Sequence, residues 1–159
     1  GHVDLPRLVH QILIETGLAP TRLELESTEA AMITDPERTT HVLRQLKSLG
    51  VSIAMDDFGT GYSSLSTLRS FPFDKIKLDR SFMTELDIAP QSAAIIRAVL
   101  ALGESLSIPI LAEGVETHSQ LEFLRAEGCN EAQGYLLGRP GLMTPDHGVE
   151  APRSTRHAA

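Results

Sequence analysis

The regular alternation of short strand-like segments with helical segments most constrains how this chain can fold. A helix is the natural connection between parallel neighbouring strands, because a parallel pair needs a long crossover. This order therefore predicts an α/β fold with a mostly parallel sheet. The five predicted strands are 22–27, 51–55, 75–79, 108–112 and 131–134.

Capping residues support the helices between these strands. Residues 5–13 carry apolar side chains at helical spacing, and Gly17 is placed to end that helix. An Asp-Pro pair, typical of an N-cap followed by the first helical residue, predicts a second helix over 35–50. Thr117 and Gln120 have the spacing of a capping box and predict a further helix.

The remaining helical segments are less sharply bounded. A short helix is expected near residues 63–69, and Pro90 opens a longer one. The pattern fades after the first 141 residues, so residues 142–159 are expected to form a weakly structured tail. The apolar face of the helix that begins at Pro90 is expected to consist of Ile95, Ala98, Val99, Leu102 and Leu106.

The charge balance excludes one class of function. Among 159 residues, Asp and Glu number 21 and Lys and Arg number 14, which gives a formal net charge of −7. Bulk nucleic-acid binding requires rows of basic side chains to neutralise phosphates, and this chain has no such row. A single cysteine and the lack of an apolar run of about 18 residues predict no internal disulfide, no membrane segment in this chain and a cytoplasmic location.

Five acidic residues lie at or near the end of a predicted strand, just before a loop. In parallel α/β folds this end of the sheet carries function. Carboxylates gathered there would repel one another unless cations lay among them, and hard oxygen ligands suit Mg²⁺ or Mn²⁺. For any one of them alone, a helix cap, a solvated loop residue or a partner of Lys or Arg is the commoner explanation. The five residues are Glu26, Asp56, Asp57, Asp79 and Glu113.

Lys77 stands out among these acids. Strand alternation places Lys77 and Asp79 on one face and Ile76 and Leu78 on the other. A lysine that points inward needs acidic neighbours. The alternative is an exposed lysine on an edge strand, where its charge discourages aggregation. The adjacent acids at 56–57 follow an apolar strand and could bridge two metal ions.

Together these segments resemble the EAL-type cyclic di-GMP phosphodiesterase domain. The resemblance rests on five blocks that occur in the family's order and with family-like spacing, and it spans roughly residues 5–141. The blocks are 23–29 (LELESTE), 56–65 (DDFGTGYSSL), 75–82 (KIKLDRSF), 112–117 (AEGVET), and 133–136 (QGYL) with 138–140 (GRP).

The resemblance implies a role for each candidate residue. It implies that Glu26 binds a first metal ion, that Asp56 bridges two metal ions, and that Asp57 and Glu113 serve the second. It further implies that Lys77 helps to hold the attacking water, while Glu113 could assist proton transfer. The supporting residues that it implies are Glu29 as anchor of the loop after the aspartate pair, Gln133 near the site, and Asp79 and Glu116 behind the ligands.

The resemblance also implies a TIM-like barrel with one reversed strand and a site at the C-terminal ends of the strands. A complete barrel has eight strands and takes about 250 residues, whereas about five strands are predicted here. We therefore expect residues 1–141 to be the C-terminal part of an EAL domain. The family's Glu-Ala-Leu motif and its asparagine metal ligand do not occur in this sequence. A partial barrel has open sheet edges, which a homodimer could cover.

Three functions remain open from the sequence. The first is hydrolysis of cyclic di-GMP to linear pGpG by the complete domain with Mg²⁺ or Mn²⁺, because cations would let an acidic protein bind an anionic phosphodiester. The second is a catalytically inactive EAL-like module that binds cyclic di-GMP or a protein partner in signalling. The third is a metal-dependent lyase or isomerase on a parallel barrel, which the ordered blocks disfavour.

Overall fold

The fold is an α/β structure built on one parallel sheet, as predicted. The computed structural model describes residues 4–59, 68, 71–86 and 88–141. The five strands lie in the order β1-β2-β3-β4-β5, and every neighbouring pair is parallel. The strands are β1 (Glu24–Thr28), β2 (Ser52–Phe58), β3 (Lys75–Leu78), β4 (Ile110–Ala112) and β5 (Glu131–Ala132).

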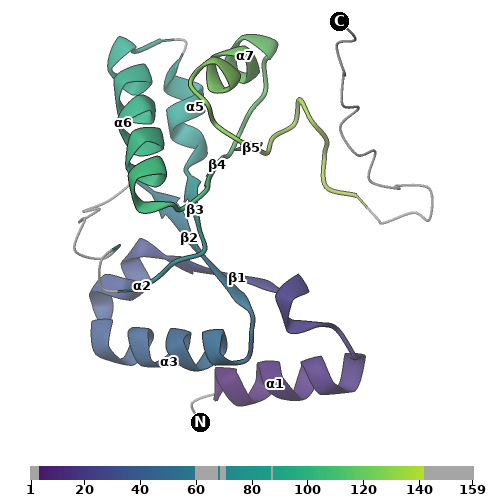
Figure 1. Cartoon of the computed structure of the whole chain (residues 1–159). Helices are drawn as coiled ribbons and strands as arrows, with labels where there is room; N and C mark the ends of the chain where they lie inside the picture. Colours follow the sequence, from purple (N-terminus) through teal and green to yellow (C-terminus); the bar gives the residue numbers. More distant parts are fainter. Residues whose placement is uncertain (1–3, 60–67, 69–70, 87, 142–159) are drawn as a thin grey trace, which may run out of the picture.

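Helices connect the strands and cover the sheet in two groups. The first group, α1 to α3, lies beside β1 and β2, and the second, α5 to α7, lies beside β3 to β5 (Figure 1). The helices are α1 (Leu5–Thr16), the 3₁₀ turn η1 (Pro20–Arg22), α2 (Glu29–Thr34), α3 (Pro36–Ser48), α5 (Arg80–Leu86), α6 (Pro90–Leu106) and α7 (His118–Ala126).

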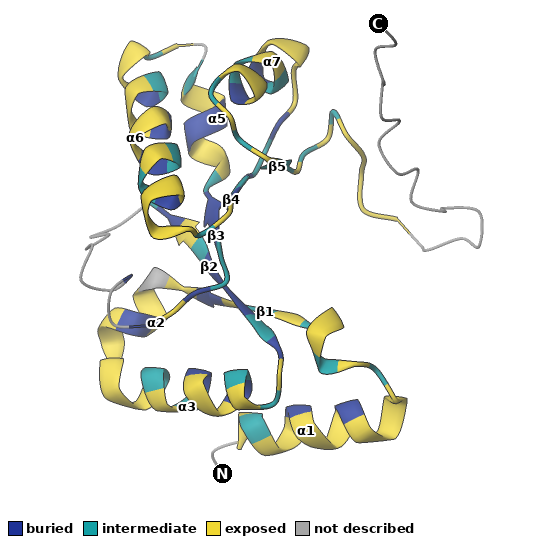
Figure 2. Ribbon diagram, in the orientation of Figure 1, coloured by how far each residue is buried: buried dark blue, intermediate teal, exposed yellow. Residues whose placement is uncertain are grey.

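The hydrophobic core lies between the sheet and these helices. Figure 2 shows buried residues along the strands and exposed residues on the outer sides of the helices. Alternate residues of the central strands, Ile53, Ile76 and Leu78, are fully buried, and Leu46 and Ile96 pack among them from α3 and α6. The apolar residues therefore occupy the helix-covered face of the sheet, which leaves the opposite face for polar side chains.

The predicted helix ends are confirmed. The Asp35 carboxylate accepts a hydrogen bond from the Arg38 backbone N–H and caps α3. Gly17 has φ 67°, a left-handed conformation that suits glycine, and it ends α1. At the start of α7, the Thr117 hydroxyl accepts from the Gln120 N–H at 3.2 Å. The Gln120 side chain in turn accepts from the Thr117 N–H and also donates to the Met83 carbonyl of α5.

We expect Thr117→Ala to lower the free energy of unfolding by about 1 kcal/mol, because it leaves the Gln120 N–H without its capping oxygen. Urea unfolding followed by circular dichroism would measure the change. Thr117→Ser retains the hydroxyl and should keep most of the stability. Equal losses in the two variants would show that the capping hydrogen bond is not the cause.

Two predictions about local structure are wrong. Strand β2 does not end at residue 55 but continues to Phe58, because Asp56 pairs with Thr28 of β1 and Phe58 pairs with Leu78 of β3. The predicted apolar face of α6 is rotated from the observed one, since Ile95 is 45% exposed. The residues of α6 that face the core are Ser92, Ile96, Val99 and Gly103.

Small residues explain the observed face of α6. A Cβ atom at Gly103 would lie 2.5 Å from the Ile110 side chain, so α6 approaches β4 more closely than a larger residue would allow.

Helices α2 and α5 were not predicted, because six and seven residues are too short to establish a helical period. The helix expected at 63–69 lies outside the described residues apart from Leu68, which is helical, and so does the tail at 142–159.

The sheet has two edges. Strand β1 pairs with β2 alone and β5 pairs with β4 alone among the described residues. The polar face of the sheet lies between these two edge strands and holds the candidate site.

The helices in the described part of the chain are too short or too polar to span a membrane.

Candidate functional site

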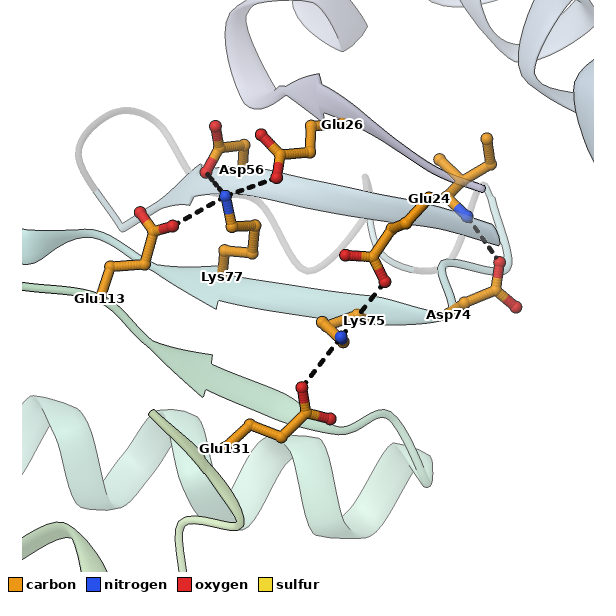
Figure 3. A network of polar contacts seen from close by, with 9 residues as sticks. Glu24, Glu26, Asp56, Asp74, Lys75, Lys77, Glu113 and Glu131 are labelled. Atoms are coloured by element: carbon orange, nitrogen blue, oxygen red, sulfur yellow. Dashed lines mark hydrogen bonds and ion pairs between the residues drawn. The ribbon is translucent and has the colours of Figure 1, made fainter. Parts of the chain in front are cut away.

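A lysine surrounded by three carboxylates forms the centre of the site. The Lys77 Nζ atom lies 2.7 Å from Glu26 Oε1, 2.7 Å from Glu113 Oε1 and 3.4 Å from Asp56 Oδ1 (Figure 3). The acids come from β1, from β2 and from the residue that directly follows β4. Parallel strands bring these residues together because their carboxyl ends meet at one edge of the sheet. We call Glu26, Asp56, Lys77 and Glu113 the upper ion layer.

Strand alternation explains the position of Lys77. Its neighbours Ile76 and Leu78 are fully buried on the helix-covered face, so Lys77 projects from the polar face. Strand β3 is central in the sheet, which rules out the alternative of an exposed edge-strand lysine. The Lys77 side chain is only 8% exposed. A charge that is so deeply buried needs the acidic partners that surround it.

The surrounding acids keep Lys77 charged. Burial lowers the pKa of the Lys77 ammonium group, but hydrogen bonds to Glu113 and Glu26 and the charge of Asp56 outweigh burial, and the pKa is raised above its usual value. Lys77 is therefore a cation throughout the physiological pH range. It is a fixed positive charge and a hydrogen-bond donor at the mouth of the site.

Asp57 adds a further negative charge beside this layer. Its backbone has φ 54°, a left-handed conformation that is uncommon for residues other than glycine. Burial raises the pKa of the Asp57 carboxyl group, and the charges of Asp56 and Asp79 raise it further against the opposing effect of Lys77. Negative charge on these neighbours therefore opposes the ionisation of Asp57 more than Lys77 favours it.

The donor chemistry of the site fits a divalent cation. Three carboxylates contact one ammonium group and Asp57 adds a fourth negative charge nearby, which leaves an excess of negative charge. The Asp56 Oδ1 atom is buried and accepts no hydrogen bond from the residues that the structure describes. Within the described ranges, no three His, Cys, Asp or Glu side chains are grouped closely enough to hold a metal ion as they stand. Lys77 Nζ lies among the acids of the upper ion layer, so their oxygens are directed at it.

The other candidate residues lie around this centre with separate contacts. Asp79 caps α5, because its Oδ1 atom accepts from the Ser81 N–H at 3.0 Å. Burial opposes ionisation of Asp79, but hydrogen bonds from Ser81 and Arg80 lower the pKa of its carboxyl group. Gln133 and Glu116 have exposed side chains. Glu29 begins α2, and its side chain lies outside the described part of the chain.

The sequence model of the EAL domain family matches residues 2–140. The chain belongs to the EAL domain family. Its relatives include an uncharacterised signalling protein of Caulobacter vibrioides, 57% identical over 98% of this chain and 20% of the relative. MucR of Pseudomonas aeruginosa, a bifunctional diguanylate cyclase and cyclic di-GMP phosphodiesterase, is 47% identical over 88% of this chain and 20% of its own length.

Solved EAL structures share the fold of this chain. The MucR phosphodiesterase in complex with c-di-GMP is 46% identical with a TM-score of 0.83, over 88% of this chain and 57% of that chain. A manganese and cyclic di-GMP complex of BlrP1 from Klebsiella pneumoniae is 37% identical with a TM-score of 0.79, over 85% of this chain and 34% of that chain. This EAL chain therefore spans only part of the proteins that it matches, and its five strands are part of a TIM-like barrel.

The sequence analysis missed a second set of charged residues in this EAL domain. Lys75 Nζ lies 3.2 Å from Glu24 Oε2 and 2.9 Å from Glu131 Oε2 (Figure 3). Glu24 and Lys75 lie two residues before Glu26 and Lys77 in the same strands, so they share the polar face. This spacing of two residues in both strands was the signal that could have revealed them.

Proposed function

We propose that this EAL domain hydrolyses cyclic di-GMP to linear pGpG in a reaction that depends on Mg²⁺ or Mn²⁺, within a longer protein. The observation that carries the proposal is the buried lysine among carboxylates at the carboxyl edge of the sheet. Support comes from the relatives MucR, NbdA and RocR of Pseudomonas aeruginosa, which are named as cyclic di-GMP phosphodiesterases. It also comes from solved relatives with cyclic di-GMP and manganese or calcium.

The carboxylates of this site would hold the divalent cations. Glu26, Asp56, Asp57 and Glu113 supply hard oxygen donors, and no described residue donates a hydrogen bond to the buried Asp56 Oδ1 atom. A bound divalent ion lowers the pKa of water and stabilises the negative charge on a leaving oxygen. Cations held by these carboxylates would therefore allow an acidic surface to accept an anionic substrate.

Lys77 would act on the attacking water and the phosphate. Its ammonium group is charged, buried and held by two hydrogen bonds, so its position is fixed before the substrate arrives. A fixed donor of this kind holds a water molecule and offsets the charge of a phosphodiester without further reorganisation. Glu113, 2.7 Å from Lys77, is placed to accept a proton.

The remaining candidates would hold these groups in place. Asp79 fixes the start of α5 directly after the strand that carries Lys77. The main chain of Gln133 links the loop after Glu113 to β5, because its N–H donates to the Ala112 carbonyl and its carbonyl accepts from Val115. Glu29 and Glu116 are proposed as supports on the family resemblance alone.

Incubation of the chain with cyclic di-GMP and Mn²⁺ or Mg²⁺ tests the proposal. We expect pGpG to form, EDTA to reduce its rate to background, and an excess of the metal to restore it. Chromatography of the nucleotides measures the product. Binding of cyclic di-GMP without turnover would favour the inactive signalling module instead. The absence of both binding and turnover would contradict both functions for this chain.

A further inference from the structure

A second ion layer lies below the proposed site and links the two edges of the sheet. We call Glu24, Lys75 and Glu131 the lower ion layer. Lys75 belongs to the central strand β3, whereas Glu24 belongs to β1 and Glu131 to β5, the two outermost strands. One ammonium group therefore contacts both edge strands of the described sheet, at 3.2 Å and 2.9 Å.

These contacts require a curved sheet. In a flat sheet, strands that are two apart lie about 10 Å from each other, so Glu24 and Glu131 would lie about 20 Å apart with Lys75 between them. Curvature toward the polar face shortens both separations. Strand β2 contributes only the short side chains of Ser52 and Ala54 at this level, so Lys75 and Glu24 can meet across it.

The lower ion layer is partly shielded from water. The exposed fractions are 20% for the Lys75 side chain, 36% for Glu24 and 38% for Glu131. The hydrogen bond to Glu131 raises the pKa of Lys75, burial opposes this effect, and the hydrogen bond to Glu24 adds to it. An ion network with one partly buried cation and two partners is held more firmly than a single exposed pair.

The two layers share their strands. Glu24 and Glu26 both come from β1, and Lys75 and Lys77 both come from β3. On the other side, β5 carries Glu131 and pairs with β4, whose end positions Glu113. Movement of β1 away from Lys75 would therefore carry Glu26 away from Lys77, and movement of β5 would pull on β4, whose end positions Glu113.

We propose that Lys75 is a positioning residue, which draws β1 and β5 toward β3 and thereby sets the spacing of Glu26 and Glu113 around Lys77. The effect of this positioning on metal binding and catalysis rests on the proposed function. When carboxylates of the upper ion layer bind a cation, they cannot all keep their contacts with Lys77, so the lower ion layer is the cross-sheet link that persists.

A double-mutant cycle tests the link without any metal or substrate. Lys77→Met should raise the unfolding equilibrium constant of the original chain by some factor. In a chain that already carries Lys75→Met, we expect this factor to be smaller by at least about threefold, because the contacts of Lys77 are already weakened there. The control is Lys47→Met. Lys47 pairs with Asp74 at 2.9 Å with comparable exposure, but it extends from α3 on the helix-covered side. Its effect should add to that of Lys77→Met.

Mn²⁺ binding tests the consequence for the site. We expect Lys75→Met to weaken Mn²⁺ binding by about tenfold, as measured by electron paramagnetic resonance of free Mn²⁺, and to lower kcat more than it changes KM. Lys75→Arg should restore most of the affinity because it keeps the charge. Lys47→Met should leave the affinity unchanged even if it lowers stability equally.

The outcomes separate this inference from the proposed function. Additive effects of Lys75→Met and Lys77→Met, or unchanged Mn²⁺ affinity in Lys75→Met, would overturn the positioning role. If the original chain neither binds Mn²⁺ nor forms pGpG, the proposed function fails, and the double-mutant cycle alone decides whether Lys75 positions Lys77 and its partners. If Lys77→Met does not fold, Glu26→Gln, which weakens the 2.7 Å contact with Lys77, takes its place in the cycle.

Discussion

Asp56→Asn is expected to reduce cyclic di-GMP hydrolysis by on the order of a thousandfold without loss of the fold. The substitution removes one negative charge and keeps the volume of the side chain. The described residues donate no hydrogen bond to the buried Asp56 Oδ1 atom, and its ion pair with Lys77 is long at 3.4 Å, so the atom can still accept a cation. Loss of several kcal/mol of charge stabilisation in the transition state corresponds to this reduction in rate. Rates of pGpG formation at saturating Mn²⁺ measure it.

The stability of this variant provides an independent check. Asp56 makes the longest of the three contacts with Lys77, at 3.4 Å, and its charge also raises the pKa of Asp57, so Asp56→Asn should change the free energy of unfolding by no more than about 1 kcal/mol. Glu104→Gln is the matched control, since it makes the same change of charge at an exposed position of α6. It should retain activity. Full activity of Asp56→Asn would contradict the assignment of Asp56 to the metal site.

Gly134→Ala is expected to lower the free energy of unfolding by about 3 kcal/mol, the largest effect on stability that we expect from adding a single carbon atom. A Cβ atom at this position would overlap the backbone nitrogen and carbonyl oxygen of Val115. Val115 is fully buried, and its carbonyl accepts a hydrogen bond from the Leu136 N–H at 3.1 Å. Backbone atoms cannot rotate away as a side chain can, so the loop after Glu113 must move.

Gly138→Ala is the control for this substitution. Apart from the two residues adjoining Gly138 in sequence, no described residue has an atom within 4 Å of a Cβ built there, so the variant should unfold at nearly the same urea concentration as the original chain. Gly134→Ala should also lower phosphodiesterase activity, because the displaced loop begins beside Glu113. If the two alanine variants unfold at the same urea concentration, the close packing of Gly134 against Val115 is not a constraint on the fold.

Much of the secondary structure could be predicted from local signals. The caps at Asp35 and Thr117 and the stop at Gly17 depend on residues within one helical turn, and all three are confirmed. The signals failed where neighbouring elements decide. The buried face of α6 depends on how closely Gly103 lets the helix approach Ile110, and this cannot be read from helical periodicity. Strand β2 extends past its apolar run because β1 and β3 supply hydrogen-bonding partners.

The sequence by itself determined the order of the elements and the placement of acids at the ends of strands, because strand period and capping act over a few residues. Only the tertiary structure decided which of these charges meet. Lys77 and Glu26 lie 51 residues apart in sequence and 2.7 Å apart in space. Their contact depends on the register of parallel strands and on the curvature of the sheet. The packing of many residues sets both properties, and no local pattern encodes them.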